Sequence, residues 1–341
     1  VNGLVNQAYF TQGKTVNQDV ETELLGVTDF QVHYGILNAL NQNFGWTEGV
    51  NKLYTTTAQD YVYKNPMRQV IFLDNHDLPR FYSVVGEDTS KYKMAFAWML
   101  TFRGIPQMYY GNEILMTGFT SPNDGYVRQD FPGGWEGDQA NKFTEAGRTQ
   151  KENNIFNYIK RLANYRKTSS AIKTGKMMQF YPVDGVYVYF RYDAKQTVMC
   201  VMNTNAEPKT IDLNRFMERI GSSQTGFDVA AGVSFRLEKN LQLMPMSNLV
   251  SLPKDESTIL FNAFPNPFLD KLTIAFSSSS TWPTELFLYD IQGIILFKKV
   301  YPPMTNEIQL SDFTYMRPGQ YILRLTHNNK PKTISIIKEG I

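Results

Sequence analysis

The sequence has little cysteine, no excess charge of either sign and no long apolar run. Its single cysteine, Cys200, excludes an intrachain disulfide and a multi-cysteine metal site. Lysine and arginine number 34 against 32 acidic residues, so the net charge of +2 indicates neither nucleic acid nor an anionic membrane as partner. No apolar run approaches the roughly 20 residues of a membrane span. We therefore predict no nucleic-acid partner and no transmembrane segment.

The composition is that of a folded chain with more than one domain. Hydrophobic residues make up 42% and charged residues 19% of the 341 residues, which excludes disorder as the main state. At about 100 to 200 residues per domain, two or three domains are expected. Aromatic residues make up 14%, which suits sugar binding and buried cores equally well. The start at Val1-Asn2-Gly3 lacks an initiator methionine and a signal sequence, so we expect a processed product or a fragment.

Residues 1–174 alternate short apolar runs with amphipathic segments, which predicts β/α units. Val70–Leu73 is a buried strand that ends in the polar turn Asp74–Asp77. A second strand, Ile105–Tyr110, ends in the polar turn Gly111–Glu113. Since the carboxyl ends of parallel strands share one edge, both turns should lie on one face. Helices are predicted at Lys91–Arg103 and Asn153–Lys167.

In the rest of the chain, apolar residues recur with a period of two. Residues 175–252 contain the predicted hairpin Val186–Tyr192 and Thr197–Asn203, and form a compact β-sandwich. Residues 253–259 are polar and are the predicted linker. Residues 260–341 form a second all-β module. Its predicted strands are Leu272–Phe276, Glu285–Tyr289, Ile294–Lys298, Gln320–Leu325 and Thr333–Ile337.

Two of these segments, Phe72–Phe81 and Gly104–Glu113, resemble late barrel strands of glycoside hydrolase family 13, the α-amylase family. Arg128–Trp135 is similar to a loop of its cyclomaltodextrinase and neopullulanase branch. The resemblance covers about residues 1–252. It implies the C-terminal part of a (β/α)8 TIM barrel followed by a β-sandwich domain C, and an α-glucan oligosaccharide as substrate.

The resemblance also implies site residues. Asp77 matches the family's transition-state-stabilising aspartate, and His76 matches a histidine that donates to the same sugar. For Asp74, Asn75 and Asp77 the alternative is that they only bind turn amides. Arg80 either pairs with a carboxylate and holds the loop or is a surface residue. The expected substrate-binding residues are His76, Asn75, Arg80, Tyr110 and Trp135, of which Tyr110 and Trp135 are equally compatible with the core.

The family's retaining mechanism needs a nucleophilic aspartate and an acid/base glutamate about 5 Å apart. The resemblance puts both on earlier strands, upstream of Val1, and Glu21, Glu23 and Asp29 have no matching motif around them. Most of the family's calcium sites are expected in the same missing half, and no cofactor or metal site is predicted in this chain. His33, beside the strand-like Phe30–Val32, is predicted to be structural.

The last module resembles a different family. Phe264–Phe268, Leu286–Gly293, Met316–Leu323 and Lys332–Lys338 are similar, in order, to the C-terminal sorting domain of type IX secretion substrates. The resemblance implies the type IX secretion machinery as partner. It also implies a secreted or outer-surface location in a Bacteroidota-type bacterium. The alternative is an additional Ig-like or sugar-binding β-sandwich.

Two hypotheses of function follow. The first is an exported α-glucan hydrolase of which this chain is the C-terminal portion, inactive by itself. The second is a non-catalytic or vestigial glucan-binding surface protein. A barrel without its first strands exposes sheet edges and apolar helix faces, so we also expect this chain to aggregate when alone.

Overall fold

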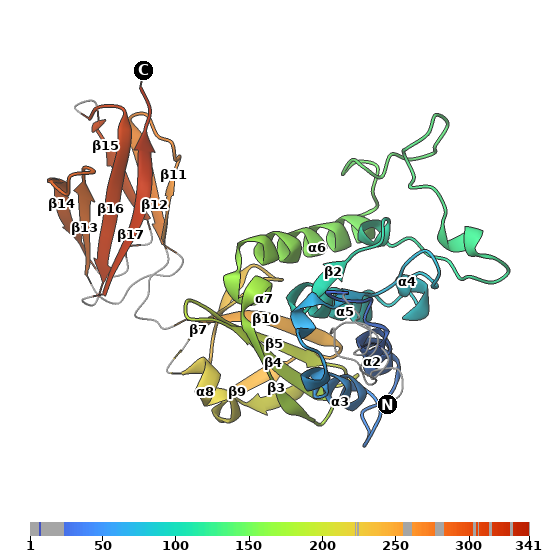
Figure 1. The fold of residues 1–341 in the computed structure, drawn as a ribbon. Helices are drawn as coiled ribbons and strands as arrows, with labels where there is room; N and C mark the ends of the chain where they lie inside the picture. The colour runs from blue at the N-terminus through green and yellow to red at the C-terminus, as the bar shows by residue number, and fades with distance from the viewer. Residues whose placement is uncertain are drawn as a thin grey trace. The chain divides into compact units, whose positions relative to one another are not determined.

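The computed structural model describes residues 7, 24–221, 223, 225–254, 261–276, 283–302, 305, 307–313, 316–327 and 330–340 (Figure 1). The chain divides into two compact units, Val1–Pro253 and Lys254–Ile341. The predicted linker 253–259 lies mostly outside the described residues, as do Glu21 and Glu23. Among the described helices, none has the length and apolar content needed to cross a membrane.

The first part of unit 1 consists of parallel strands joined by helices. Strand β1 (Val70–Phe72) pairs in parallel with β2 (Ile105–Gln107), and Thr28 forms a parallel bridge to Val70 on the other side of β1. Parallel neighbours need a crossover connection, which helices supply here. The helices are α2 (Phe30–Asn41), α3 (Val50–Thr57), α4 (Phe81–Val84), α5 (Thr89–Thr101), α6 (Gln150–Thr168) and α7 (Ser170–Thr174). Short 3-10 helices are η1 (Asp60–Val62), η2 (Pro66–Arg68), η3 (Asn112–Ile114) and η4 (Asp124–Val127).

The two predicted helices are confirmed, and each begins at a side-chain cap. The Asp88 carboxylate accepts the backbone N–H groups of Ser90 and Lys91, at 2.7 and 3.2 Å, at the start of α5. Thr149 and Glu152 form a capping box at the start of α6. Every side chain of α5 from position 94 to 101 is buried, so this helix forms the centre of the unit.

The strand-like prediction for Phe30–Val32 is wrong, because these residues open helix α2. Asp29 caps this helix by accepting the Val32 N–H at 3.3 Å. Val32, Ile36 and Leu40 recur every four residues and are buried, which favours a helix over a strand. His33 is structural, as predicted: it is 3% exposed and stacks on Phe72 with 4.7 Å between ring centroids.

Burial of His33 makes stability depend on pH. Desolvation lowers the pKa of His33 from 6.5 to about 4. Between these two values the imidazole is mostly protonated in the unfolded chain and mostly neutral in the native state. The free energy of unfolding should therefore fall by about 2 kcal/mol from this group between pH 7 and pH 5. Urea denaturation of the chain and of His33→Phe across this range tests it. Parallel pH profiles for the two proteins would contradict the prediction.

The β domain of unit 1 is a six-stranded sheet of order β3-β4-β5-β10-β7-β8 with a two-stranded sheet β6-β9. The predicted hairpin is confirmed as β4 (Val186–Tyr192) and β5 (Thr197–Asn203). The other elements are β3 (Lys176–Val183), β6 (Lys209–Asp212), η5 (Leu213–Phe216), α8 (Met217–Ile220), β7 (Thr225–Asp228), β8 (Val233–Arg236), β9 (Asn240–Leu243) and β10 (Ser247–Lys254).

Strand β4 is buried on both faces because it separates two cores. Tyr187 and Tyr189 belong to the cluster that contains helices α2, α5 and α6. Val188 and Phe190 point to the opposite face and pack with Phe216 of η5. The β domain therefore covers the helical layer of the same unit, and the two parts share one core.

Unit 2 is a β-sandwich of two antiparallel sheets, with orders β11-β12-β15 and β14-β13-β16-β17. Alternate residues of facing strands, including Leu272, Ile274, Leu286 and Leu288, fill the space between the sheets. All five predicted strands are confirmed, and β11 and β15 were missed. The strands are β11 (Phe261–Phe264), β12 (Lys271–Phe276), β13 (Thr284–Tyr289), β14 (Ile295–Tyr301), β15 (Glu307–Ser311), β16 (Gly319–His327) and β17 (Lys330–Lys338).

The described sheet of β1 and β2 leaves apolar side chains accessible. Ile105 in β2 is 49% exposed and Met108 just after it is 45% exposed. We expect the chain to self-associate through this surface, and the double variant Ile105→Thr, Met108→Thr to do so less. Light scattering coupled to size-exclusion chromatography measures this. Val183→Thr, at a similarly exposed position in β3, is the control, and a monomeric unmodified chain would contradict the prediction.

Candidate functional site

A buried aspartate connects the polar turns that follow β1 and β2. One Asp74 carboxylate oxygen accepts the side-chain amide N–H of Asn112 at 2.7 Å, and the other accepts the backbone N–H of Phe81 at 2.7 Å. Burial raises the pKa of Asp74, while these two hydrogen bonds act in the opposite direction. The Tyr92 hydroxyl donates to the Asn112 carbonyl at 2.8 Å. The prediction that the two turns share one face is confirmed.

The next three residues divide between turn formation and an accessible polar pair. The Asn75 side-chain oxygen accepts the backbone N–H of Asp77 at 2.8 Å, so Asn75 stabilises the turn. The side chains of His76 and Asp77 are each 63% exposed, with 3.3 Å between His76 Nε2 and Asp77 Oδ2. Asp74 and Asn75 thus bind turn amides, whereas the Asp77 carboxylate contacts side chains and is accessible to a ligand.

Arg128 holds the exposed pair from a segment about fifty residues later. Its Nε donates to the His76 carbonyl at 2.8 Å, and one terminal nitrogen donates to Asp77 at 3.0 Å and to Asp124 at 2.7 Å. Arg128 and Asp124 were not among the predicted site residues. The only signal for Arg128 was its place in the segment Arg128–Trp135, since spacing along the chain does not reveal a contact with Asp77.

Arg80 holds the loop as expected, but it does so without an ion pair, and its burial contradicts both a surface position and a direct contact with substrate. The side chain is fully buried and forms no ion pair within the described part of the chain. It donates to the Tyr110 carbonyl, and its guanidinium lies 4.2 Å from the Tyr109 ring centroid and 4.7 Å from that of Tyr110. Arg80 therefore holds the loop through a carbonyl and two aromatic faces.

Tyr110 and Trp135 are accessible and do not belong to the core. Tyr110 is 38% exposed, and its hydroxyl donates to the Gln129 carbonyl at 2.7 Å. Trp135 is 67% exposed, in a loop where Asp138 accepts its backbone N–H at 3.1 Å. The structure brings Tyr110 onto Arg80, and no contact connects Trp135 to Asp77 within the described residues. The Trp135 indole and the Tyr110 phenol are aromatic faces on which a sugar ring can stack.

The assembled site contains an accessible carboxylate, an imidazole and a guanidinium on one loop surface. These groups donate and accept hydrogen bonds, which suits a ligand rich in hydroxyl groups. No group of three histidine, cysteine, aspartate or glutamate side chains in the described ranges could hold a metal ion. Asp29, the remaining carboxylate considered above, is fully buried and paired with Arg103 at 2.6 Å, so it has a structural role.

Family models match three consecutive parts of the chain. Residues 21–175 match the α-amylase catalytic domain, residues 177–251 the cyclo-malto-dextrinase C-terminal domain, and residues 262–339 the secretion system C-terminal sorting domain. The first two matches lie within unit 1 and the third within unit 2.

Curated relatives and solved structures agree with these matches. A cyclomaltodextrin glucanotransferase of Thermoanaerobacterium thermosulfurigenes is 32% identical over 53% of this chain and 22% of its own length. An α-amylase of Niallia circulans is 30% identical over 53% of this chain and 30% of its own length. An acarbose complex of the Geobacillus thermoleovorans α-amylase superimposes with a TM-score of 0.55 at 21% identity, over 69% of this chain and 49% of that one. The chain thus spans about half of that structure and under a third of these curated relatives.

The β/α units with their polar strand ends and the β domain that follows them correspond to the matched α-amylase catalytic domain and cyclo-malto-dextrinase C-terminal domain. Residues 21–251 thus match the catalytic domain and the C-terminal domain of the α-amylase family, glycoside hydrolase family 13, and a match to a secretion-system sorting domain follows them in the chain.

Proposed function

We propose that the protein is an exported α-glucan-active enzyme and that this chain supplies the substrate-binding, transition-state-stabilising part of its site. The observation that carries the proposal is the accessible Asp77 carboxylate, held beside His76 by Arg128 at the end of β1. A carboxylate placed there can hydrogen-bond sugar hydroxyls more strongly as positive charge develops on the ring. The named activities of the relatives, cyclomaltodextrin glucanotransferase and α-amylase, support an α-glucan as substrate.

In this proposal Asn75 and Arg80 position the loop, while Tyr110 and Trp135 stack on glucose rings. The proposal takes the nucleophile and the acid/base from a segment upstream of Val1, together with most of the family's calcium ligands. The match of residues 177–251 supports the cyclomaltodextrinase side of the cyclomaltodextrinase and neopullulanase branch. The substrates proposed for this branch are maltodextrins, cyclodextrins, pullulan or starch. The sorting domain supports export by type IX machinery to the surface of a Bacteroidota-type bacterium.

The test is hydrolysis of maltoheptaose and cyclodextrin by the chain together with the segment that precedes it in the gene. We expect reducing sugar to be released with retention of anomeric configuration, which NMR of the first product shows. Neither hydrolysis nor glucosyl transfer by a folded protein would overturn the proposal.

A second candidate is a non-catalytic glucan-binding protein. It is favoured by one observation: Asp29, the described carboxylate considered for these roles, is fully buried and paired with Arg103. Calorimetric titration with maltoheptaose separates the two candidates. Binding without turnover by the longer protein supports the second candidate, and the absence of binding by a folded chain would exclude it.

A further inference from the structure

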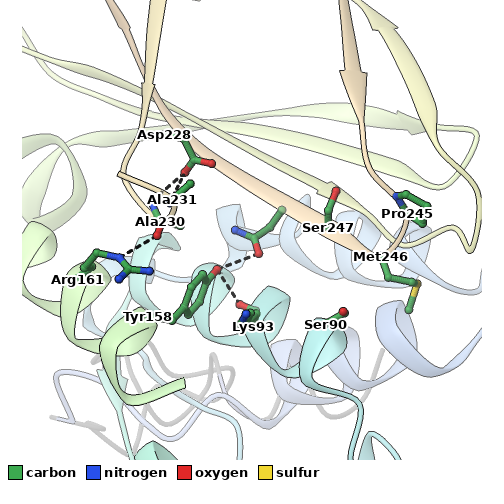
Figure 2. A pocket seen from close by; sticks show the side chains of 11 residues that line it. Ser90, Lys93, Tyr158, Arg161, Asp228, Ala230, Ala231, Pro245, Met246 and Ser247 are labelled. Carbon is green, nitrogen blue, oxygen red and sulfur yellow. Dashed lines mark hydrogen bonds between the residues drawn. The ribbon is translucent and has the colours of Figure 1, made fainter. Parts of the chain in front are cut away.

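A cavity of about 370 Å³ lies within unit 1, away from the Asp77 loop, where α5 and α6 meet the β domain (Figure 2). Its size is at the lower end of the roughly 300 to 1,000 Å³ of small-molecule sites. Lys93 reaches it from α5, Tyr158 and Arg161 from α6, and Asp228 and Asn248 from the β domain. A ligand here would contact three separate parts of the unit.

Neither cation in the cavity wall is in direct contact with a carboxylate of the described residues. Neither Lys93 nor Arg161 forms an ion pair within the part of the chain that the structure describes. The Nε of Arg161 donates to the Ala230 carbonyl at 2.9 Å, which orients the guanidinium and leaves its two terminal nitrogens available. The Lys93 ammonium lies 5.6 Å from the Tyr158 ring centroid.

Asn248 adds an unused hydrogen-bond donor to the same cavity wall. The Tyr158 hydroxyl donates to the Asn248 side-chain oxygen at 2.9 Å, a shorter contact than the 3.2 Å to the Lys93 carbonyl. The side-chain amide nitrogen of Asn248 is buried and has no hydrogen-bond partner among the described residues. A buried donor without a partner is unfavourable, so a ligand acceptor at this place would be favourable.

Among the described residues of the wall, one acidic residue, Asp228, stands against the two cations. One oxygen of Asp228 accepts the backbone N–H groups of Ala230 and Ala231, at 2.9 and 3.2 Å, and so holds the turn after β7. Burial raises the pKa of Asp228, whereas its backbone hydrogen bonds and the charge of Arg161 act in the opposite direction. The cavity therefore keeps an excess of positive charge and of hydrogen-bond donors.

A neutral sugar fits this wall less well than an anion does. Sugar sites present an open aromatic face, but the only aromatic side chain of this wall, Tyr158, is 7% exposed. Unpaired guanidinium and ammonium groups instead favour a planar or tetrahedral oxyanion, since charge-assisted hydrogen bonds are about twice as strong as neutral ones.

We propose that this cavity binds a small oxyanion, a carboxylate or phosphate group, between Lys93, Arg161 and the Asn248 amide. Bound there, the anion connects α5 and α6 to the β domain, and it stabilises the folded unit by mass action. This inference is independent of the proposed glucan activity, because none of its residues belongs to the Asp77 loop.

The experiment titrates the chain with inorganic phosphate and with malonate at constant ionic strength, using chloride as the compensating salt. Phosphate binding is followed by 31P line broadening, and binding of either anion by the shift in melting temperature. We expect saturable binding, weakened at least tenfold in Lys93→Gln and Arg161→Gln and weakened in Asn248→Ala. The matched control is Lys160→Gln. Lys160 is exposed and lies on α6 beside Arg161, so this variant should bind the anions as the unmodified chain does.

The tighter of the two anions identifies whether the site prefers phosphate or carboxylate. Equal effects of phosphate, malonate and chloride, or unchanged binding in Lys93→Gln and Arg161→Gln, would overturn the proposal. Maltotriose binding that depends on Lys93 and Arg161, without phosphate or malonate binding, would overturn it in favour of a sugar site.

Discussion

Asp77→Asn is expected to lower kcat/KM for maltoheptaose by about 10²- to 10³-fold in the protein that contains this chain and its upstream segment. The amide keeps the size of the carboxylate but removes the charge that strengthens its hydrogen bonds to the sugar in the oxocarbenium-like transition state. Because the side chain is 63% exposed, the melting temperature should stay unchanged. Initial rates and a thermal melt of the same sample provide both readouts.

Asp124→Asn is the matched control for this variant. Asp77 and Asp124 both accept a hydrogen bond from the same terminal nitrogen of Arg128, at 3.0 and 2.7 Å, and both are about half exposed or more. If Asp77 acts on the sugar, Asp124→Asn should retain most of the activity. Equal losses in the two variants would mean that Asp77 only positions Arg128, and no loss in Asp77→Asn would contradict its proposed role.

Arg103→Ala is expected to lower the free energy of unfolding by about 3–5 kcal/mol, because it leaves two carboxylates without their partner. Arg103 donates to Asp29 at 2.6 Å and, through two nitrogens, to Asp60 at 2.5 and 2.8 Å. The Arg103 and Asp29 side chains are 2% and 0% exposed. Urea denaturation at pH 7 measures the loss. Arg103→Lys keeps the charge but not the two-nitrogen contact, so its free energy of unfolding should lie between those of the unmodified chain and Arg103→Ala.

The pH dependence of Arg103→Ala identifies the cause of the loss. Burial raises the pKa of Asp60, and Arg103 opposes this rise, so the pKa rises further in the variant. The native variant then binds a proton more tightly than the unfolded chain, and lowering the pH from 7 to 5 should reduce its deficit. Asp124→Ala, which breaks an exposed ion pair, should cost no more than about 1 kcal/mol. A deficit of that small size in Arg103→Ala would contradict the prediction.

Local pattern was sufficient for most of the fold. The apolar residues of α5, the capping box of α6 and the period of two in β4 and β5 all depend on residues close in sequence, so these elements could be predicted. The short strands β11 and β15 were missed because four or five residues of alternating pattern give a weak signal. Phe30–Val32 was misread because the cap at Asp29 and the burial of α2 outweigh the strand preference of Phe and Val.

Sequence alone determined that the chain has a β/α region with two polar strand ends, a β domain and a further β-sandwich, and it singled out Asp77 and His76. Only the tertiary structure decided which side chains contact and position these residues. Arg128 meets Asp77 across about fifty residues and also pairs with Asp124, and Arg80 is buried against Tyr109 and Tyr110. Contacts of this kind depend on loop paths and on the cost of burying charge, which are properties of the packed chain and leave no period in the sequence.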